Sequence, residues 1–285
     1  MDTTEKHVKM LYPTVRVRTD SAGGSGTIIY SKPDASSDKY ETYVLTNHHV
    51  IADNIKLTKK WNTLVQRDLQ SDTLTDCNVE RFEFEYESWE EGHSAYKAEI
   101  CCYDKDLDLG LLKVKSSKQF EFVATMIEKD THKENLRLFQ PLYAVGCGLG
   151  HPPLQTKGEL AGFSDIIDNE PYWMSTAPTI FGNSGGSVYL ADSGEFIGIP
   201  SRISVVMIGF GGSAITHMSF FIPITTIYGF LSDQMYNFLF DGNYTSEQCA
   251  EMRMKKRDRD ERMMAIDVSR EGQKESMEST SPSSQ

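Results

Sequence analysis

The chain has 285 residues, of which 41 are acidic and 29 are basic, for a formal net charge of −12. This length can bury one large core or two smaller ones, and the acidic balance argues against a general nucleic-acid-binding protein. Five cysteines without metal-ligand spacing predict neither a disulfide framework nor a metal site. The first residues lack the apolar run of a signal peptide, and no apolar stretch is long enough to cross a membrane, which predicts a cytoplasmic protein.

The first strong pattern covers residues 13–50 and predicts three short strands. Apolar and charged residues alternate over 15–18, as in a half-buried strand. Glycines and serines at 21–26 form a turn, residues 27–30 form the returning strand, and 43–46 form the third. Strands in quick succession without a helical period favour an antiparallel all-β unit.

Two histidines, His48 and His49, follow the third predicted strand. Histidine has an ordinary pKa near ~6.5, so at the end of a buried strand it is suited to act as a general base. The alternative is a hydrogen-bonded structural histidine.

Residues 53–98 have the least readable pattern, apart from strict alternation over 81–86, which predicts a strand. Residues 58–78 are predicted to form an inserted surface loop. Such a loop either shapes a binding cleft or is a solvated insertion without a role of its own.

An aspartate, Asp108, opens the apolar run at 109–112, where a loop enters a core. Its carboxylate is therefore expected to be partly buried, as a group that orients an imidazole must be. Asp104 and Asp106 belong to the polar lead-in and are expected to be more exposed.

Residues 182–186 read Gly-Asn-Ser-Gly-Gly. A serine between glycines in a tight turn suits covalent acyl transfer, because glycine permits dihedrals that bring two amide N–H groups to one point. Those N–H groups are predicted to belong to Gly182 and Ser184. The alternative is a glycine-rich hairpin turn without a catalytic role. His49, Asp108 and Ser184 argue against it, because they follow one another in the chain order His, Asp, Ser of the chymotrypsin triad.

Over residues 12–230 the chain resembles the trypsin-like (chymotrypsin-fold) serine peptidases, and most closely their HtrA/Deg branch. His49 is preferred to His48 because Thr46 precedes it by the spacing of that family, and an apolar turn follows it. The motifs that carry the resemblance are Gly24-Ser25-Gly26-Thr27, Leu45-Thr46-Asn47-His48-His49-Val50, Asp108-Leu109-Gly110-Leu111-Leu112 and Gly182-Asn183-Ser184-Gly185-Gly186.

The resemblance implies an all-β fold of two antiparallel six-stranded β-barrels with the active site between them. A barrel carrying the histidine and aspartate is expected over residues 1–120, and a barrel carrying the serine over 121–226. Apolar residues at helical spacing predict a helix over 227–245. A charged helix and a disordered tail, the latter from Ser276 onward, are expected over 246–285. We expect no PDZ domain, since too few residues remain for one.

The resemblance also implies a serine endopeptidase with the catalytic triad His49, Asp108 and Ser184 and an oxyanion hole at Gly182 and Ser184. Trypsin-type enzymes carry a specificity aspartate six positions before the serine, where this chain has Pro178. A small or aliphatic residue before the cut is therefore expected. The predicted substrate-binding residues are Thr179, Ile180, Ile199, Pro200, Ser201 and Arg202.

No cofactor or metal is expected, and the expected partner is a polypeptide substrate rather than a nucleic acid or a membrane. The sequence is compatible both with a homo-oligomer and with a protein partner that binds the C-terminal tail. The alternative function is a binding or assembly protein, such as one in a viral or phage particle, that keeps the fold with little or no turnover.

Overall fold

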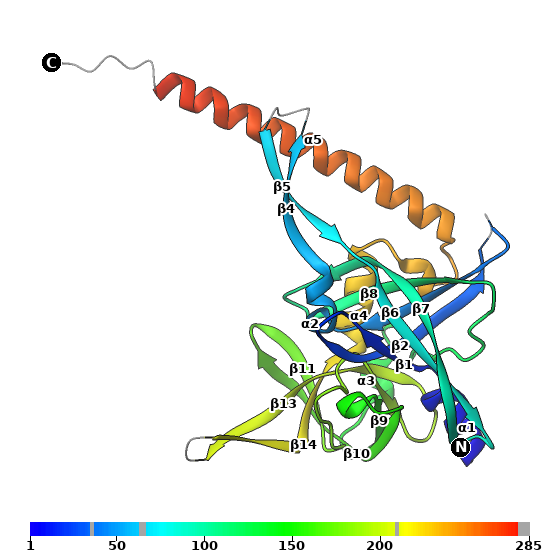
Figure 1. The fold of residues 1–285 in the computed structure, drawn as a ribbon. Coiled ribbons are helices and arrows are strands. Elements are labelled where there is room, and N and C mark those ends of the chain that lie inside the picture. The colour runs from blue at the N-terminus through cyan, green and yellow to red at the C-terminus, as the bar shows by residue number, and fades with distance from the viewer. Residues whose placement is uncertain (35–36, 63–66, 209–210, 279–285) are drawn as a thin grey trace. The chain divides into compact units, whose positions relative to one another are not determined.

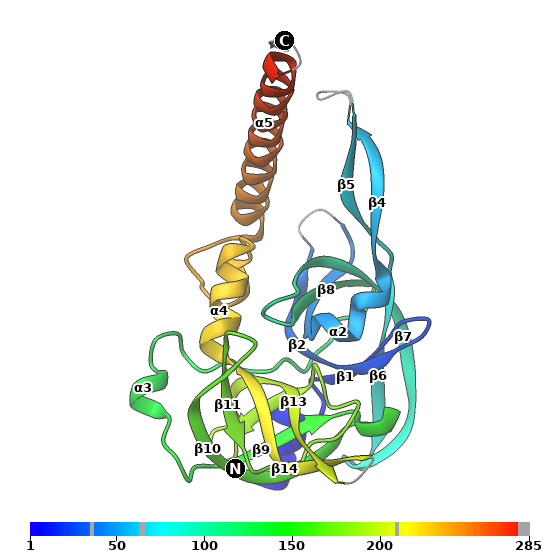
Figure 2. The same cartoon turned by 90° about the vertical axis from the view of Figure 1, so that its left-hand side faces the viewer.

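The computed structural model of the chain describes residues 1–34, 37–62, 67–208 and 211–278. These residues divide into two units. The first unit comprises Met1–Ile55 and Leu74–Ser232, and the second comprises Lys56–Thr73 and the residues from Asp233 onward. Both of the closed, antiparallel barrels lie in the first unit (Figures 1 and 2). The expected all-β fold is thereby confirmed.

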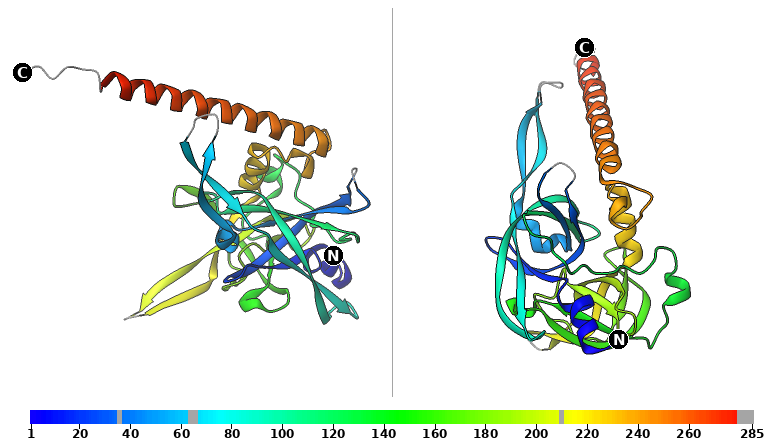
Figure 3. Two further views of the ribbon diagram at one scale, coloured as in Figure 1. Left: turned by 45° about the horizontal axis from the view of Figure 1, so that its top comes forward. Right: turned by 90° about the vertical axis from the view of Figure 1, so that its right-hand side faces the viewer.

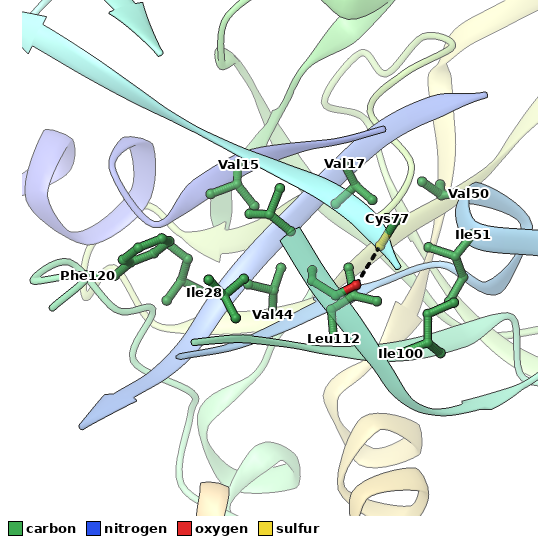
Figure 4. Close-up of a cluster of buried hydrophobic side chains, with 13 residues drawn as sticks. Val15, Val17, Ile28, Val44, Val50, Ile51, Cys77, Ile100, Leu112 and Phe120 are labelled. Atoms are coloured by element: carbon green, nitrogen blue, oxygen red, sulfur yellow. Dashed lines mark hydrogen bonds between the residues drawn. The ribbon is translucent and has the colours of Figure 1, made fainter. Parts of the chain in front are cut away.

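The first barrel closes in the strand order β1-β2-β3-β8-β7-β6. Val15 and Val17 of β1 are fully buried, as the alternation predicted, and they pack with Ile28 and Val44 in the core (Figure 4). The six strands are β1 (Thr14–Arg18), β2 (Gly23–Pro33), β3 (Tyr40–Thr46), β6 (Cys77–Glu85), β7 (Trp89–Asp104) and β8 (Leu109–Ser116).

One charged residue of β1 departs from the simple alternation. Arg16 is only 9% exposed, because β1 pairs with β2 on one side and with β6 on the other. Its guanidinium forms an ion pair with Glu80, its register partner on β6, and donates to the carbonyl of Gly150. A buried cation of this kind persists only when it is paired.

The second barrel closes in the order β10-β11-β14-β13-β12-β9. β13 and β14 continue together beyond the barrel as a long hairpin (Figures 1 and 3). The six strands are β9 (Pro141–Gly146), β10 (Leu154–Ile167), β11 (Glu170–Ser175), β12 (Ser187–Leu190), β13 (Phe196–Ile208) and β14 (Gly211–Pro223).

The helices of the first unit are short. They are α1 (Thr3–Lys6), a π-helical turn at His7–Leu11, α2 (His48–Ile51), α3 (His132–Asn135), α4 (Ile224–Asp233) and 3₁₀ turns at Ala52–Asn54 and Gly148–Gly150. The length predicted for the helix over 227–245 is wrong: α4 ends at Asp233, and Met235 has a φ of 59°, outside the range of a right-handed helix. Its apolar side chains, including Ile227 and Leu231, are buried as expected.

The second unit contains a two-stranded hairpin, a 3₁₀ turn at Asn237–Leu239 and one long helix. The hairpin consists of β4 (Ile55–Asn62) and β5 (Arg67–Leu74), so the surface loop predicted over 58–78 is wrong in its local structure. The helix α5 (Ser246–Glu278) is densely charged, as expected. It includes residues 276–278, for which disorder was predicted wrongly, whereas 279–285 lie outside the described residues. None of the described helices is both long and apolar enough to cross a membrane.

Candidate active site

A carboxylate and an imidazole meet in the first barrel, where β3 ends and its neighbour β8 begins. His49 lies in the short helix α2 directly after β3, and Asp108 lies in the turn that leads into β8. His49 Nδ1 is 3.0 and 2.9 Å from the two carboxylate oxygens of Asp108, and the His49 backbone N–H donates to Oδ1 at 3.0 Å. Since an ionised carboxylate only accepts hydrogen bonds, Nδ1 carries the hydrogen and Nε2 is left to accept a proton.

The other histidine is placed differently. The ring of His48 lies against Tyr103, with a centroid separation of 5.3 Å. Burial, the largest influence, lowers the pKa of His48. It is therefore His49, rather than His48, that pairs with Asp108.

The Asp108 carboxylate is buried, with 3% of the residue exposed, and is held by further contacts. Ser201 Oγ donates to its Oδ2 at 2.6 Å, and Asn47 Nδ2 donates to its backbone carbonyl at 2.8 Å. Its backbone has a φ of 54°, a left-handed conformation that aspartate tolerates better than most residues.

Burial alone would raise the pKa of Asp108. The hydrogen bond and charge of His49, together with the hydrogen bond from Ser201, outweigh burial and hold the pKa below its ordinary value. Asp108 is therefore ionised at neutral pH. A lowered pKa contributes stability above the unfolded-state pKa, and this contribution is lost as the pH falls through the folded-state value.

The turn around Ser184 is shaped by two glycines with positive φ, 97° at Gly182 and 84° at Gly185. Asn183 closes the turn: its Oδ1 accepts from the Ile180 N–H at 3.1 Å, and its own N–H donates to the Ile180 carbonyl at 3.0 Å. Within the described residues, the N–H groups of Gly182 and Ser184 have no hydrogen-bond acceptor. Two donors free of protein partners flank the serine, as an oxyanion hole requires.

A serine of the first barrel fixes this turn of the second. Ser25 is fully buried; its Oγ donates to the Gly182 carbonyl at 2.6 Å and accepts from the Cys147 N–H at 2.7 Å. The Ser25 N–H donates to the Ser184 carbonyl at 2.8 Å. The sequence predicted only that Ser25 lies in a turn. Its hydrogen bonds to the Ser184 turn follow from its position in β2, which brings it beside the second barrel.

The peptide before Gly182 is also held. The Leu149 N–H donates to the Phe181 carbonyl at 2.7 Å. In a trans peptide the carbonyl and the following N–H point in opposite directions. The Gly182 N–H is therefore directed away from Leu149.

Ser184 and His49 lie close to a common neighbour. A Cβ atom placed on Gly24 would lie 3.0 Å from the Ser184 carbonyl oxygen and 2.6 Å from a methyl group of Val50, the residue after His49. In the described structure the His49 ring and the Ser184 hydroxyl make no hydrogen bond with each other. Catalytic hydrogen bonds are often long in the absence of substrate. The missing hydrogen bond therefore does not exclude a transfer of the Ser184 proton to His49.

A pocket of about 420 Å³ lies next to the turn and is lined from both barrels, by Gly23 and Gly24 of the first and by Leu149, Phe181 and Gly182 of the second. A larger pocket, about 540 Å³, is lined by the N-terminal helices and residues 151–155. His49, Asp108 and Ser184 do not line this larger pocket. The candidate active site is therefore located by these three residues and not by the size of a pocket.

The six predicted substrate-binding residues have different environments. Thr179 is buried, with its hydroxyl donating to Ser219 Oγ at 2.7 Å, whereas Ile180 is half-buried. Ile199 is fully buried, and the Pro200 carbonyl accepts from the Gly185 N–H at 3.2 Å.

The last two of these residues make polar side-chain contacts. Ser201 bonds Asp108, as described above, and Arg202 forms a 3.3 Å ion pair with Asp168. Among the described residues, no group of three or more His, Cys, Asp or Glu side chains is arranged to hold a metal ion.

The Gly185 conformation gives a stability prediction. A Cβ atom there would lie 2.1 Å from the Ser25 carbonyl oxygen and 2.5 Å from Thr46 Oγ1, at a φ that side chains disfavour. Gly185→Ala should therefore lower the free energy of unfolding by about 3 kcal/mol or more, measured by urea denaturation. Gly150→Ala is the control: its φ is also positive, at 78°, but in the described part of the chain no atom beyond its two sequence neighbours lies within 4 Å of an added Cβ. The control should lose about 1 kcal/mol, from backbone strain alone, and equal losses would contradict the steric explanation.

The chain is similar to known proteins. Residues 24–199 match the family model of the trypsin-like peptidase domain. Two curated proteins named "Probable periplasmic serine endoprotease DegP-like" are similar over 212 residues: that of Pseudomonas fluorescens strain Pf-5 at 27% identity and that of Pseudomonas putida strain GB-1 at 28%. Each match covers 73% of this chain but only 34% of the relative, so the chain spans about a third of their length.

Solved structures share the fold. The HtrA-type protease AlgW with a tripeptide has a TM-score of 0.57 at 18% identity, covering 82% of this chain and 64% of AlgW. Deg5 has a TM-score of 0.52 at 20% identity, covering 80% of this chain and 94% of Deg5.

The cytoplasmic location predicted from the N-terminal residues is contradicted, because both curated relatives are named as periplasmic. The resemblance to HtrA/Deg peptidases is confirmed by these relatives and by the shared fold. The family model matches more than half of the length of this chain, and the chain therefore belongs to the trypsin-like peptidase family.

Proposed function

We propose that the protein is a serine endopeptidase in which Ser184 is the nucleophile, His49 the general base and acid, and Asp108 the group that orients His49. The observation that carries the proposal is the buried Asp108 carboxylate bonded to His49 Nδ1, since it leaves Nε2 available as a base. Membership of a peptidase family supports the same reading and does not favour a non-catalytic binding or assembly role.

The mechanism follows the Ser-His-Asp template. Ser184 Oγ attacks the peptide carbonyl carbon while its proton passes to His49 Nε2, and the carbonyl oxygen becomes an oxyanion. The N–H groups of Gly182 and Ser184 stabilise that charge, each by about 3–4 kcal/mol. The C–N bond then breaks as His49 returns the proton to the amine. Water, deprotonated by His49, hydrolyses the acyl-enzyme and regenerates Ser184.

The substrate proposed is a polypeptide with a small or aliphatic residue before the cut. Pro178 offers no charge to a lysine or arginine side chain. Thr179 is proposed to line the site for the residue before the cut. Its hydroxyl donates to Ser219 Oγ, and its N–H donates to the Thr216 carbonyl at 3.0 Å, so this residue is bonded to β14.

Covalent labelling tests the proposal. A fluorescent fluorophosphonate should modify the folded protein at one position, and peptide mapping by mass spectrometry should locate the label on Ser184, because only an activated serine reacts with such a probe. Protein denatured beforehand should remain unlabelled. A folded protein that takes up no label, or takes it up at another serine, would contradict the proposal.

A further inference from the structure

The asparagine before the two histidines does not make the contact usual for its position. Asn47 is fully buried between the end of β3 and the start of α2. An asparagine there commonly caps the helix, with its side-chain oxygen accepting from a backbone N–H of the first turn. The Asn47 side chain makes no capping hydrogen bond. Its Nδ2 donates instead to the backbone carbonyl of Asp108 at 2.8 Å, across to the turn that leads into β8.

The other half of the Asn47 amide is unsatisfied. Among the residues that the structure describes, the buried Oδ1 atom has no hydrogen-bond partner. Turning the amide over would place Oδ1 where Nδ2 lies, 2.8 Å from the Asp108 carbonyl oxygen, and two acceptors cannot bond each other. A buried acceptor without a partner lowers stability, which offsets the gain from the Nδ2 bond. The asparagine therefore calls for an explanation other than stability.

The Asp108 backbone is in a conformation that needs support. Its φ of 54° lies in the left-handed region, which is unfavourable for residues with a side chain. The Asp108 N–H makes a long hydrogen bond, 3.3 Å, to the Lys105 carbonyl. Because a peptide plane is rigid, holding the Asp108 carbonyl also holds its Cα atom and the direction in which its carboxylate leaves the backbone.

The same short segment holds both ends of Asp108. Asn47 Nδ2 binds the backbone carbonyl, while the His49 N–H and the His49 ring bind the carboxylate. The two residues are separated only by His48. The imidazole and the carboxylate are therefore positioned relative to one rigid turn.

We propose that Asn47 is a positioning residue: its Nδ2–H group keeps Asp108 in the conformation in which the carboxylate orients His49. This inference rests on the roles proposed for His49 and Asp108. Asn47 acts through Asp108 and touches none of the reacting atoms. Since a small misplacement of a catalytic group can cost about 10²-fold in rate, loss of this donor should affect the rate far more than the stability.

Asn47→Leu tests the inference. Leucine has nearly the shape of asparagine but neither a donor nor an acceptor, so it removes the bond to Asp108 and the unsatisfied oxygen together. For a quenched fluorescent peptide with valine before the cut, kcat should fall about 10²-fold, while KM should change less than about three-fold. The urea midpoint should stay within about 0.5 M of the wild-type value. Asn47→Ser is a second variant, because its hydroxyl can cap α2 but is too short to reach Asp108, and its kcat should fall similarly.

Asn54→Leu is the matched control. Asn54 is also buried, at 7% exposed, and its Nδ2 also donates to backbone carbonyls, those of Thr75 and Asp76. None of these groups is bonded to His49 or Asp108. This variant should lower the urea midpoint and keep kcat within about three-fold of wild type.

A spectroscopic measurement separates positioning from stability and needs no turnover. The proton on His49 Nδ1, bonded to a carboxylate, should give a downfield ¹H resonance in the folded protein. In both Asn47 variants this resonance should move upfield or disappear, because a weaker hydrogen bond deshields the proton less, whereas Asn54→Leu should leave it unchanged. A folded Asn47→Ser protein with wild-type kcat and an unmoved resonance would overturn the proposal. Failure of fluorophosphonate labelling would contradict the endopeptidase function, while the resonance would still decide whether Asn47 positions Asp108.

Discussion

Replacing Ser184 by alanine is expected to lower kcat/KM for peptide cleavage by about 10⁶-fold. The alanine cannot form the acyl-enzyme, and the remaining oxyanion donors and binding contacts support only a small residual rate. Cleavage of a quenched fluorescent peptide with valine before the cut measures the effect. The Ser184 hydroxyl makes no hydrogen bond within the described residues, so the free energy of unfolding should change by less than about 0.5 kcal/mol.

Ser187→Ala is the matched control for this prediction. Ser187 is fully buried three residues further on, and its hydroxyl is not among the groups proposed for catalysis. Its kcat/KM should stay within about ten-fold of the wild-type value. A Ser184→Ala protein that cleaves at a rate near that of the Ser187→Ala control would exclude Ser184 as the nucleophile.

The sequence was most informative where chemistry depends on short, local patterns. The glycines at 182 and 185 indicated unusual dihedrals, and both have positive φ in the structure. The aspartate that opens the apolar run of β8 was expected to be buried, and Asp108 is 3% exposed. Such features depend on only a few neighbouring residues, so they can be recognised before the fold is known.

Contacts between distant segments could not be predicted in the same way. Arg16 and Glu80 are far apart in sequence and meet because β1 and β6 are register partners, so the simple alternation of β1 gave no sign of a buried cation. The Ser25 hydroxyl bridges two loops of the second barrel, and Ser201 bonds Asp108 rather than only lining the substrate strand. Each role depends on how the barrels pack, and single-sequence patterns carry no signal for that packing.

Local structure without an apolar period was also difficult to predict. The segment over 58–78 mixes leucines and charges, and it was predicted as a loop although β4 and β5 pair there. A two-stranded hairpin has no buried face to impose strict alternation. α4 ends two residues before Met235, which has a positive φ. Since Met235 is neither a glycine nor a proline, no signal in the sequence marked this break.

Taken together, these contacts divide the proposed catalytic work between the barrels. The first barrel supplies His49 and Asp108, while the second supplies Ser184, the two N–H donors and Ser201, which reaches back to the carboxylate. The relative position of the barrels therefore sets both the orientation of the base and the shape of the Ser184 turn.

Replacing Asp108 by asparagine should lower kcat/KM by about 10⁴-fold. Three donors converge on the carboxylate: the His49 ring, the His49 N–H and the Ser201 hydroxyl. An asparagine presents one acceptor oxygen and one NH₂ donor, so the NH₂ group would favour the His49 tautomer that accepts at Nδ1. Nε2 would then carry the hydrogen and could not take the proton of Ser184. The same quenched peptide assay measures the loss.

Asp106→Asn provides the control, because Asp106 is exposed in the turn just before Asp108 and is not bonded to His49. It should retain wild-type activity. Ser201→Ala should have an intermediate effect, because it removes one donor from the carboxylate but leaves the His49 tautomer unchanged. If Asp108→Asn remains folded by circular dichroism and still cleaves within ten-fold of the wild-type rate, the carboxylate does not set the tautomer, and the role given to Asp108 is wrong.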